Sequence, residues 1–145
     1  MKPRAGLVQL CPGTDRLCGI VLEKHLDAAG PAFSEALGER AGLDQVAAEI
    51  EAGTAMVIDI RDIRERVESG AIPGAISAPR GMLEFWFDPE SPYHQDRYQP
   101  EGRYIFYCAA GWRSALATKV IGELGFDDVA HLESGFAGWL ESGKE

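Results

Sequence analysis

The sequence is poor in basic residues and in long apolar runs, and each shortage excludes a class of protein. Its 14 Lys and Arg residues face 23 Asp and Glu residues, which gives a formal net charge of -9. An acidic protein repels phosphate backbones and anionic lipid headgroups, so we expect neither nucleic acid nor a membrane surface as a partner. No segment approaches the roughly 18 consecutive apolar residues of a membrane-spanning helix. The start, MKPRAGLVQLCPG, is too polar and too often interrupted by Pro and Gly for a secretory signal.

Cysteine is also scarce, and its three copies are odd in number, which argues against a disulfide framework. Free thiols are typical of the reducing cytoplasm, where we expect the protein to act. Cys11 and Cys18, with His25 further along the chain, fit no compact zinc pattern. We therefore interpret these two cysteines as ordinary thiols and expect no metal ion.

The rest of the composition is that of an ordinary globular protein. The 145 residues are 46% hydrophobic and 26% charged, which suits one compact domain. Residues 1–41 stand apart because they contain scattered Gly and Pro and only short helical patterns. We interpret 1–41 as an N-terminal extension that packs on the main body or on a second subunit, in which case the protein is a homodimer. Residues 42–145 are expected to form the main domain.

Residues 42–145 alternate between short β-branched or aromatic runs and helical patterns. The predicted strands are 56–60, 75–77, 104–107 and 129–132. The predicted helices are 44–51, 62–69, 82–87, 114–124 and 136–140. Asp44 and Ser114 are candidate N-caps. An apolar stripe is expected along the helix 114–124, formed by Leu116, Val120, Ile121 and Leu124. The alternation predicts an α/β fold with a parallel sheet and helices on both of its faces.

A lone cysteine, Cys108, follows the predicted strand 104–107 and precedes a helix. The positive end of a helix favours a thiolate over a thiol, which makes Cys108 a candidate nucleophile. The loop between Cys108 and Arg113 consists of Ala109, Ala110, Gly111 and Trp112. Such a loop can curl with its backbone N–H groups toward the sulfur and form a nest for an anion. Asp59 lies near the end of another strand, and ligands of open α/β sheets bind at the carboxyl ends of the strands.

Four motifs occur in a fixed order along the chain. They are DIR at 59–61, ESGAIPGA at 68–75, YCAAGWRS at 107–114 and LESGFAGW at 132–139. Together they resemble the single-domain rhodanese family of sulfurtransferases, over about residues 42–143. The resemblance implies that Cys108 takes a sulfane sulfur from a donor such as thiosulfate and carries it as a persulfide, without a metal or an organic cofactor. It also implies a cradle of backbone N–H groups from Ala110, Gly111, Trp112 and Arg113.

The resemblance also implies that the length of the loop favours sulfur over phosphate. The related cell-division phosphatases have a loop one residue longer than the stretch between Cys108 and Arg113, and the shorter ring suits a single sulfur atom better. Arg113 is the only cation of the loop. Selection of the thiosulfate dianion is therefore expected to be modest, and a persulfide or polysulfide is an alternative donor. The chain departs from the family pattern at Ala71, where a histidine is common, and at Ser134, where a glycine is common; neither change removes the nucleophile.

The expected supporting residues are Asp59, Arg61 and Ser114. Asp59 either braces the loop, accepting hydrogen bonds from Ser114 or Arg113, or forms a structural ion pair at the end of its strand. Arg61 either steers the anionic donor or pairs with Glu65 four residues on. Ser114 is expected to cap the helix that follows the loop. Four aromatic side chains either wall the site or belong to the core: Phe85, Trp86, Phe87 and Tyr93.

Three functions are consistent with these residues. The first is a rhodanese-type sulfurtransferase with a ping-pong cycle through a Cys108 persulfide. Its donor is a small sulfur-containing anion, and its acceptor is a small thiophile such as cyanide or a protein thiol. The second is a sulfur carrier or regulatory module that delivers sulfur to a protein partner, with the N-terminal extension as its docking arm. The third is a cysteine phosphatase or arsenate reductase on the same fold. Cys11 or Cys18 is a minor candidate to resolve the persulfide as a disulfide.

Overall fold

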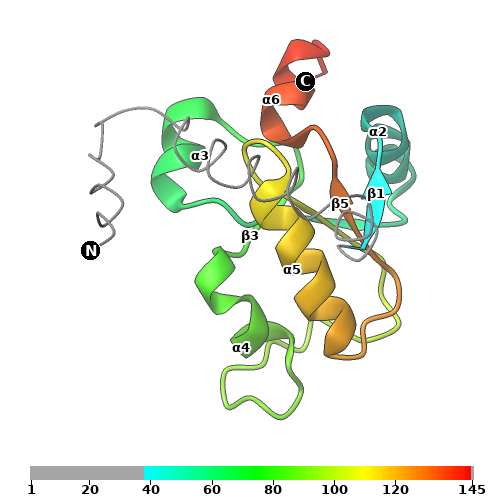
Figure 1. The fold of residues 1–145 in the computed structure, drawn as a ribbon, viewed down its shortest axis with the longest axis vertical. Helices are drawn as coiled ribbons and strands as arrows, with labels where there is room; N and C mark the ends of the chain where they lie inside the picture. Colours follow the sequence, from blue (N-terminus) through cyan, green and yellow to red (C-terminus); the bar gives the residue numbers. More distant parts are fainter. Residues whose placement is uncertain (1–37, 145) are drawn as a thin grey trace, which may run out of the picture.

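A five-stranded parallel sheet forms the centre of the protein (Figure 1). The computed structural model describes residues 38–144. The strands are β1 (Glu39–Ala41), β2 (Met56–Asp59), β3 (Ile76–Ser77), β4 (Tyr104–Tyr107) and β5 (Val129–Leu132). They lie side by side in the order β1-β5-β4-β2-β3. The predicted parallel α/β fold is confirmed.

The edge strand β1 was not predicted. It pairs with β5, with Arg40 opposite His131, and it lies inside the range 1–41 that the sequence assigned to an extension. Its sequence is ERA, in which Glu39 and Arg40 are exposed and only Ala41 is buried. So short and charged a segment carries no apolar alternation from which a strand could be predicted. The rest of the extension lies outside the described residues.

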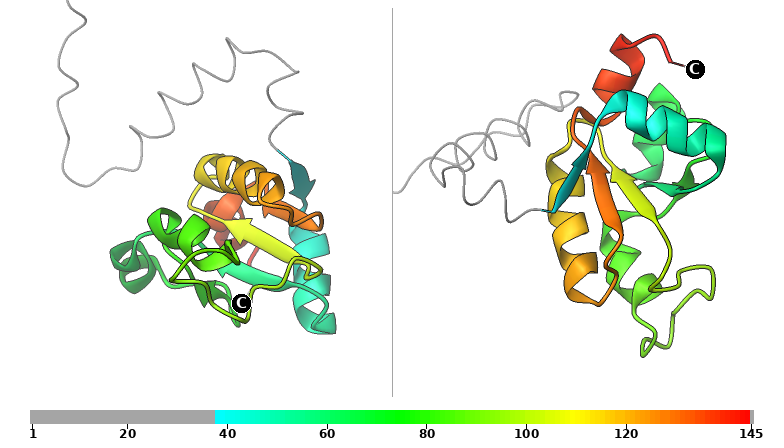
Figure 2. Two further views of the ribbon diagram at one scale, coloured as in Figure 1. Left: turned by 90° about the horizontal axis from the view of Figure 1, so that it is seen from below. Right: turned by 90° about the vertical axis from the view of Figure 1, so that its right-hand side faces the viewer.

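Helices cover both faces of the sheet (Figure 2). They are α2 (Leu43–Ala52), α3 (Ile63–Ser69), α4 (Leu83–Phe87), α5 (Trp112–Glu123) and α6 (Gly135–Glu141). A short 3-10 turn, Arg80–Met82, leads into α4. Buried side chains of α4 and α5 pack on one face of the sheet, and those of α2 and α6 pack on the other. Within residues 38–144, no helix is both long and apolar enough to cross a membrane.

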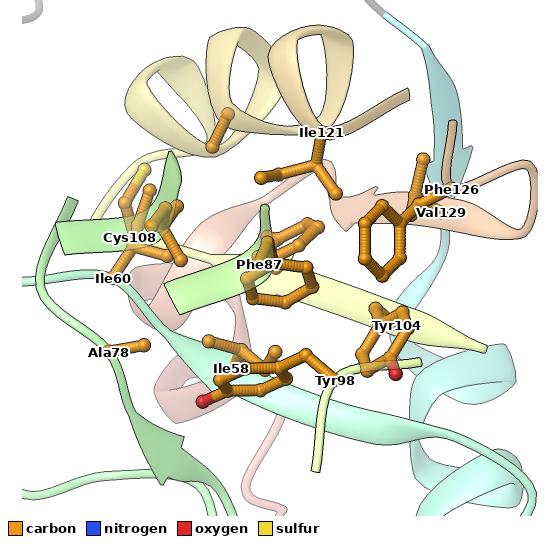
Figure 3. Packing of buried hydrophobic residues seen from close by; sticks show 13 residues of the cluster. Ile58, Ile60, Ala78, Phe87, Tyr98, Tyr104, Cys108, Ile121, Phe126 and Val129 are labelled. Carbon is orange, nitrogen blue, oxygen red and sulfur yellow. The ribbon is translucent and has the colours of Figure 1, made fainter. Parts of the chain in front are cut away.

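Both faces of the central strand β4 are buried, which explains its unbroken apolar sequence YIFY. Tyr104 and Phe106 point to the α4–α5 side. There Phe87 stacks on Tyr98 with 4.1 Å between ring centroids and meets the edge of Phe126 (Figure 3). Phe87 therefore belongs to the core.

The other aromatic side chains of this region divide between core and surface. Trp86 packs against the same core cluster as a partly buried side chain. Phe85 and Tyr93 are 50% and 63% exposed and meet edge to face, with 6.1 Å between their ring centroids.

The helix ends correct several predictions. Gly42 occupies the N-cap of α2, so Asp44 lies inside the first turn and is not the cap. Gly53 ends α2 with a φ of 65°. Asp62 caps α3 and accepts a hydrogen bond from the N–H of Arg64. The helix α5 starts at Trp112, two residues before the predicted start.

The buried face of α5 also differs from the predicted stripe. Leu116 and Leu124 are 36% and 37% exposed. The side chains that face the core are mostly small: Ser114, Ala115, Ala117, Thr118 and Ile121. Small side chains let the helix lie close to the sheet. Of the predicted stripe, Ile121 is fully buried and Val120 half-buried, whereas the two leucines lie at the surface.

Candidate active site

Cys108 is the first residue after β4, at the carboxyl edge of the sheet. Its exposed fraction is 1%, and it belongs to the core cluster with Ile60, Ala78 and Leu83. Figure 3 shows its side chain next to Ile60 on the side of the sheet that α5 covers. The side chain is therefore enclosed on its apolar side and meets polar groups only toward the loop and the start of α5.

Two polar groups contact the sulfur. The backbone N–H of Gly111 donates to Sγ at 3.2 Å, and the hydroxyl oxygen of Ser114 lies 3.5 Å from Sγ. Of the four expected cradle amides, that of Gly111 thus makes a hydrogen bond to the sulfur in this conformation. Trp112 and Arg113 form the first turn of α5. The first N–H groups of a helix have no carbonyl partner within it, and they supply the positive end of its dipole.

Gly111 holds the turn between the loop and α5 in a conformation that favours glycine. Its φ is 92°, in the left-handed region. A Cβ at this position would overlap the carbonyl oxygen of Glu133, which follows β5. A larger residue would therefore displace the amide that contacts the sulfur.

Ser114 is buried in the first turn of α5, and the prediction that it caps the helix is wrong. Its hydroxyl donates to the carbonyl of Gly111 at 3.1 Å and touches the Cys108 sulfur. While the hydroxyl donates to the carbonyl, its oxygen can accept the S–H of a thiol. When the sulfur is ionised, the same O–H can turn toward it. Ser114 therefore has a partner in both protonation states of the cysteine.

The segment after β5 supports the loop from the other side. The N–H of Phe136 donates to the carbonyl of Cys108 at 2.8 Å, and the N–H of Ala137 donates to the carbonyl of Ala109 at 3.0 Å. Gly135 has a φ of 62°, and a Cβ there would lie 2.5 Å from the carbonyl oxygen of Ala109. The motif at 132–139 thus fixes the backbone of the loop, a role that sequence spacing alone did not reveal.

Asp59 and Arg61 form a buried ion pair beneath this edge. Asp59 is fully buried and accepts hydrogen bonds from the Nε and Nη2 atoms of Arg61 at 2.9 and 2.7 Å. The hydroxyl of Tyr107 also donates to Asp59, at 2.8 Å. Burial raises the pKa of Tyr107, and the negative charge of Asp59 adds to this shift. The hydroxyl therefore stays protonated and acts as a donor.

The contacts of this ion pair correct two predictions. The side-chain partners of Asp59 are Arg61, Tyr107 and, at 3.5 Å, Arg66, and the expected hydrogen bonds from Ser114 or Arg113 do not form. Arg61 does not pair with Glu65, and its 1% exposure leaves no surface for a donor. It instead donates to the carbonyl of Gly70 and lies 4.2 Å from the ring centre of Phe136. Asp59 and Arg61 form a buried ion pair at the end of β2, and Tyr107 and Arg66 are further members of this group that the sequence analysis missed.

Arg113 connects the start of α5 to α3. Its two terminal nitrogens donate to the two carboxylate oxygens of Glu65 at 2.9 and 2.8 Å. The hydrogen bonds from Arg113 hold the pKa of Glu65 below its usual range, against the effect of burial. Arg113 thus orders the loop and the helix start. Glu65, which the sequence analysis offered as a partner of Arg61, is instead the partner of Arg113.

The remaining candidates lie apart from this arrangement. Cys11, Cys18 and His25 are outside the described residues. Among residues 38–144, no three His, Cys, Asp or Glu side chains gather closely enough to hold a metal ion. The residues that converge at the carboxyl edge of β4 are therefore Cys108, Gly111 and Ser114.

The model of the rhodanese-like domain matches residues 42–142 of the sequence. The chain belongs to the rhodanese-like domain family. This match confirms the resemblance that the four motifs indicated.

Two curated relatives match part of the chain. A mouse protein, thiosulfate sulfurtransferase/rhodanese-like domain-containing protein 3, is 32% identical over 90 residues, 59% of this chain and 57% of the relative. A tRNA uridine(34) hydroxylase from Mesorhizobium japonicum is 37% identical over 95 residues, 63% of this chain and 28% of the hydroxylase. The chain thus matches little more than half of one relative and less than a third of the other. Rhodanese-like domains therefore occur in proteins with different activities.

Two solved structures extend the comparison. A protein of unknown function from Rhodopseudomonas palustris, described as a possible tyrosine phosphatase, has a TM-score of 0.71 and 34% identity, covering 97% of this chain and 98% of that one. The human single-domain sulfurtransferase has a TM-score of 0.62 and 27% identity, covering 72% of this chain and 96% of that one. Both structures have the fold described above.

Proposed function

We propose that this chain is a rhodanese-type sulfurtransferase in which Cys108 carries the transferred sulfur as a persulfide. The position of its sulfur carries the proposal: Sγ lies 3.2 Å from the amide nitrogen of Gly111 and 3.5 Å from the hydroxyl oxygen of Ser114, below the start of α5. An amide, a hydroxyl and a helix N-terminus all stabilise negative charge. Sγ carries negative charge as the nucleophile, and in the persulfide the outer sulfur bonded to Sγ carries it.

The reaction needs two displacements at sulfur. With thiosulfate as donor, the Cys108 thiolate attacks the outer sulfur and forms a new S–S bond. The S–S bond of thiosulfate breaks, and its electron pair leaves with sulfite. An acceptor such as cyanide then attacks the outer sulfur of the persulfide, thiocyanate departs, and the thiolate is restored. Charge is conserved in each half-reaction, and no further oxidant or reductant takes part.

The surroundings of Cys108 suit a reactive intermediate that must be protected from water. Apolar side chains of Ile60, Ala78 and Leu83 share its cluster, and 1% of the residue is exposed. A small donor or acceptor would approach over Ala109, which is half-buried, and Ala110, which is exposed. Their methyl groups offer little obstruction. We place the activity in the cytoplasm, where thiols stay reduced, with a small sulfur-containing anion as donor and a small thiophile or a protein thiol as acceptor.

A cysteine phosphatase is the second candidate, because the similar structure from Rhodopseudomonas palustris is described as a possible tyrosine phosphatase. A tetrahedral phosphate dianion needs strong cationic donors. Here both terminal nitrogens of Arg113, the cation of the loop, are bound by Glu65. This pairing and the short loop favour sulfur transfer.

Intact-mass spectrometry tests the proposal. Incubation with thiosulfate or an alkyl persulfide should add the mass of one sulfur atom to the chain, and cyanide should remove it. The variant Cys108→Ser should gain no sulfur, whereas a Cys11→Ser/Cys18→Ser double variant should still gain it. Sulfur loading that survives in Cys108→Ser would overturn the assignment.

Two activity measurements separate the alternatives. A loaded protein that turns over cyanide very slowly would be a sulfur carrier for a protein partner. If the wild type hydrolyses an aryl phosphate but gains no sulfur, and Cys108→Ser abolishes this hydrolysis, the protein is a phosphatase.

A further inference from the structure

Arginines at the carboxyl edge of the sheet are each bound to a carboxylate. The pairs are Arg61 with Asp59 (2.7 Å), Arg80 with Glu84 (2.8 Å) and Arg113 with Glu65 (2.8 Å), and Arg66 shares Asp59 with Arg61 at 3.5 Å. Arg80 belongs to this edge because its N–H donates to the carbonyl of Ile60, directly after β2. Three carboxylates therefore offset most, but not all, of the positive charge of these four arginines, and Glu65 offsets that of Arg113, the arginine of the loop.

Glu65 is held against Arg113 from two directions. Its two carboxylate oxygens accept from the two terminal nitrogens of Arg113, and one of them also accepts the N–H of Asp62 at 3.0 Å. The second contact is half of the capping box of α3. The side chains of Glu65 and Arg113 are only 25% and 30% exposed, so solvent screens the pair incompletely. The lowered pKa of Glu65 keeps this carboxylate ionised at neutral pH.

Charge compensation has different consequences for different sulfur donors. Thiosulfate brings two negative charges toward a sulfur that is enclosed by apolar side chains, and an unpaired charge in such surroundings is costly. The Glu65 carboxylate repels it, whereas Arg113 can attract it only by weakening its contacts with Glu65. An alkyl persulfide brings one negative charge at most, and its alkyl group is compatible with the apolar side of the site.

Building on the proposed function, we infer that Glu65 is a specificity-determining residue, which makes the site prefer an alkyl persulfide over thiosulfate as sulfur donor. The Cys108 thiolate attacks the outer sulfur of the persulfide and forms an S–S bond to it. The S–S bond of the donor breaks, and its electron pair leaves with the alkyl thiolate, which takes up the proton of the donor.

The variant Glu65→Gln tests this inference. Glutamine also completes a capping box, so α3 keeps its N-terminal hydrogen bonds while the carboxylate charge is lost. We expect kcat/KM for thiosulfate to rise about fivefold or more, mostly through a lower KM, because one repulsive charge near a dianion is removed. For a low-molecular-weight alkyl persulfide, we expect a change of no more than about twofold.

Glu68→Gln is the matched control. It removes one negative charge from the same helix, at an exposed position that interacts with Arg64. We expect this variant to leave the ratio of the two donors unchanged. A wild type that uses thiosulfate better than the alkyl persulfide would overturn the inference, as would equal effects of Glu65→Gln and Glu68→Gln. In both cases, as long as Cys108 is still loaded with sulfur, only the inference about Glu65 fails and the sulfurtransferase proposal stands. If neither donor loads Cys108, the proposed function fails, and the inference fails with it.

Discussion

Buried polar side chains near Cys108 have two different physical tasks. Asp59 and Arg61 form a desolvated ion pair, and removing one partner of such a pair costs about 3–5 kcal/mol because the other charge stays buried. Substitutions there would test folding before they tested chemistry. Ser114 is a neutral residue whose hydroxyl lies 3.5 Å from the sulfur. It is the better probe of the reaction.

We predict that Ser114→Ala slows sulfur transfer without unfolding the protein. The change removes a hydroxyl that can donate to the sulfur anion, and a net hydrogen bond contributes about 0.5–1.5 kcal/mol, so kcat/KM should fall about twofold to tenfold with any donor. Steady-state kinetics with thiosulfate and cyanide measure this effect. Ser91→Ala is the control, since that hydroxyl accepts the N–H of Tyr93 in a different loop. Unchanged kinetics in Ser114→Ala would remove Ser114 from the proposed mechanism.

At the scale of elements, the sequence predicts those strands and helices whose buried residues form a recognisable pattern along the chain. Strands β2, β4 and β5 were predicted because they are short runs rich in β-branched, aromatic or other apolar residues. The strand β1 has no such run, and the inner face of α5 consists, apart from Ile121, of small residues that hydrophobic periodicity does not mark.

The same distinction applies to the site. Cys108 and its loop are a local pattern and were found. The contact of Arg113 with Glu65 joins residues 48 positions apart, and the hydrogen bond from Ala137 to Ala109 joins α6 to the loop. Spacing along the chain does not determine such contacts, because they depend on how α3 and α6 pack against the sheet.

We predict that Gly135→Ala destabilises the protein more than the positive φ of Gly135 alone would cause. An L-residue in the left-handed region costs roughly 1–2 kcal/mol, and here a Cβ would also press on the carbonyl of Ala109. Gly143 is the matched control, since its φ is 69° and a Cβ there would meet no atom within 4 Å. Urea unfolding should show a greater loss of stability for Gly135→Ala than for Gly143→Ala, together with weaker sulfur loading. Equal losses would mean that the contact with Ala109 relaxes easily.

Across the whole molecule, ionic contacts hold both ends of the sheet. Tyr107 and the Asp59–Arg61 pair lie at the carboxyl end. At the opposite end, Arg103 contacts three carboxylates from separate parts of the chain, those of Glu39, Glu49 and Asp128. Hydrogen bonds from Arg103 lower the pKa of Glu49 despite its partial burial. The stability of the folded protein therefore depends on several ionisable groups whose protonation state must not change.

This dependence predicts two stages of acid destabilisation. His131 lies buried in β5; burial lowers its pKa, Arg40 lowers it further, and Glu133 opposes them. Below about pH 6.5 the unfolded chain takes up a proton on this histidine that the folded protein resists, so stability is full above that pH and falls below it, by at most about 1.4 kcal/mol per pH unit. Glu49 and Glu65, whose pKa values are lowered, should add a second loss below about pH 4.3. Urea unfolding between pH 7.5 and 3.5 measures both stages. In His131→Gln the loss between pH 6.5 and 5 should become smaller while the loss at lower pH persists, and an unchanged slope between pH 6.5 and 5 would show that His131 does not contribute to it.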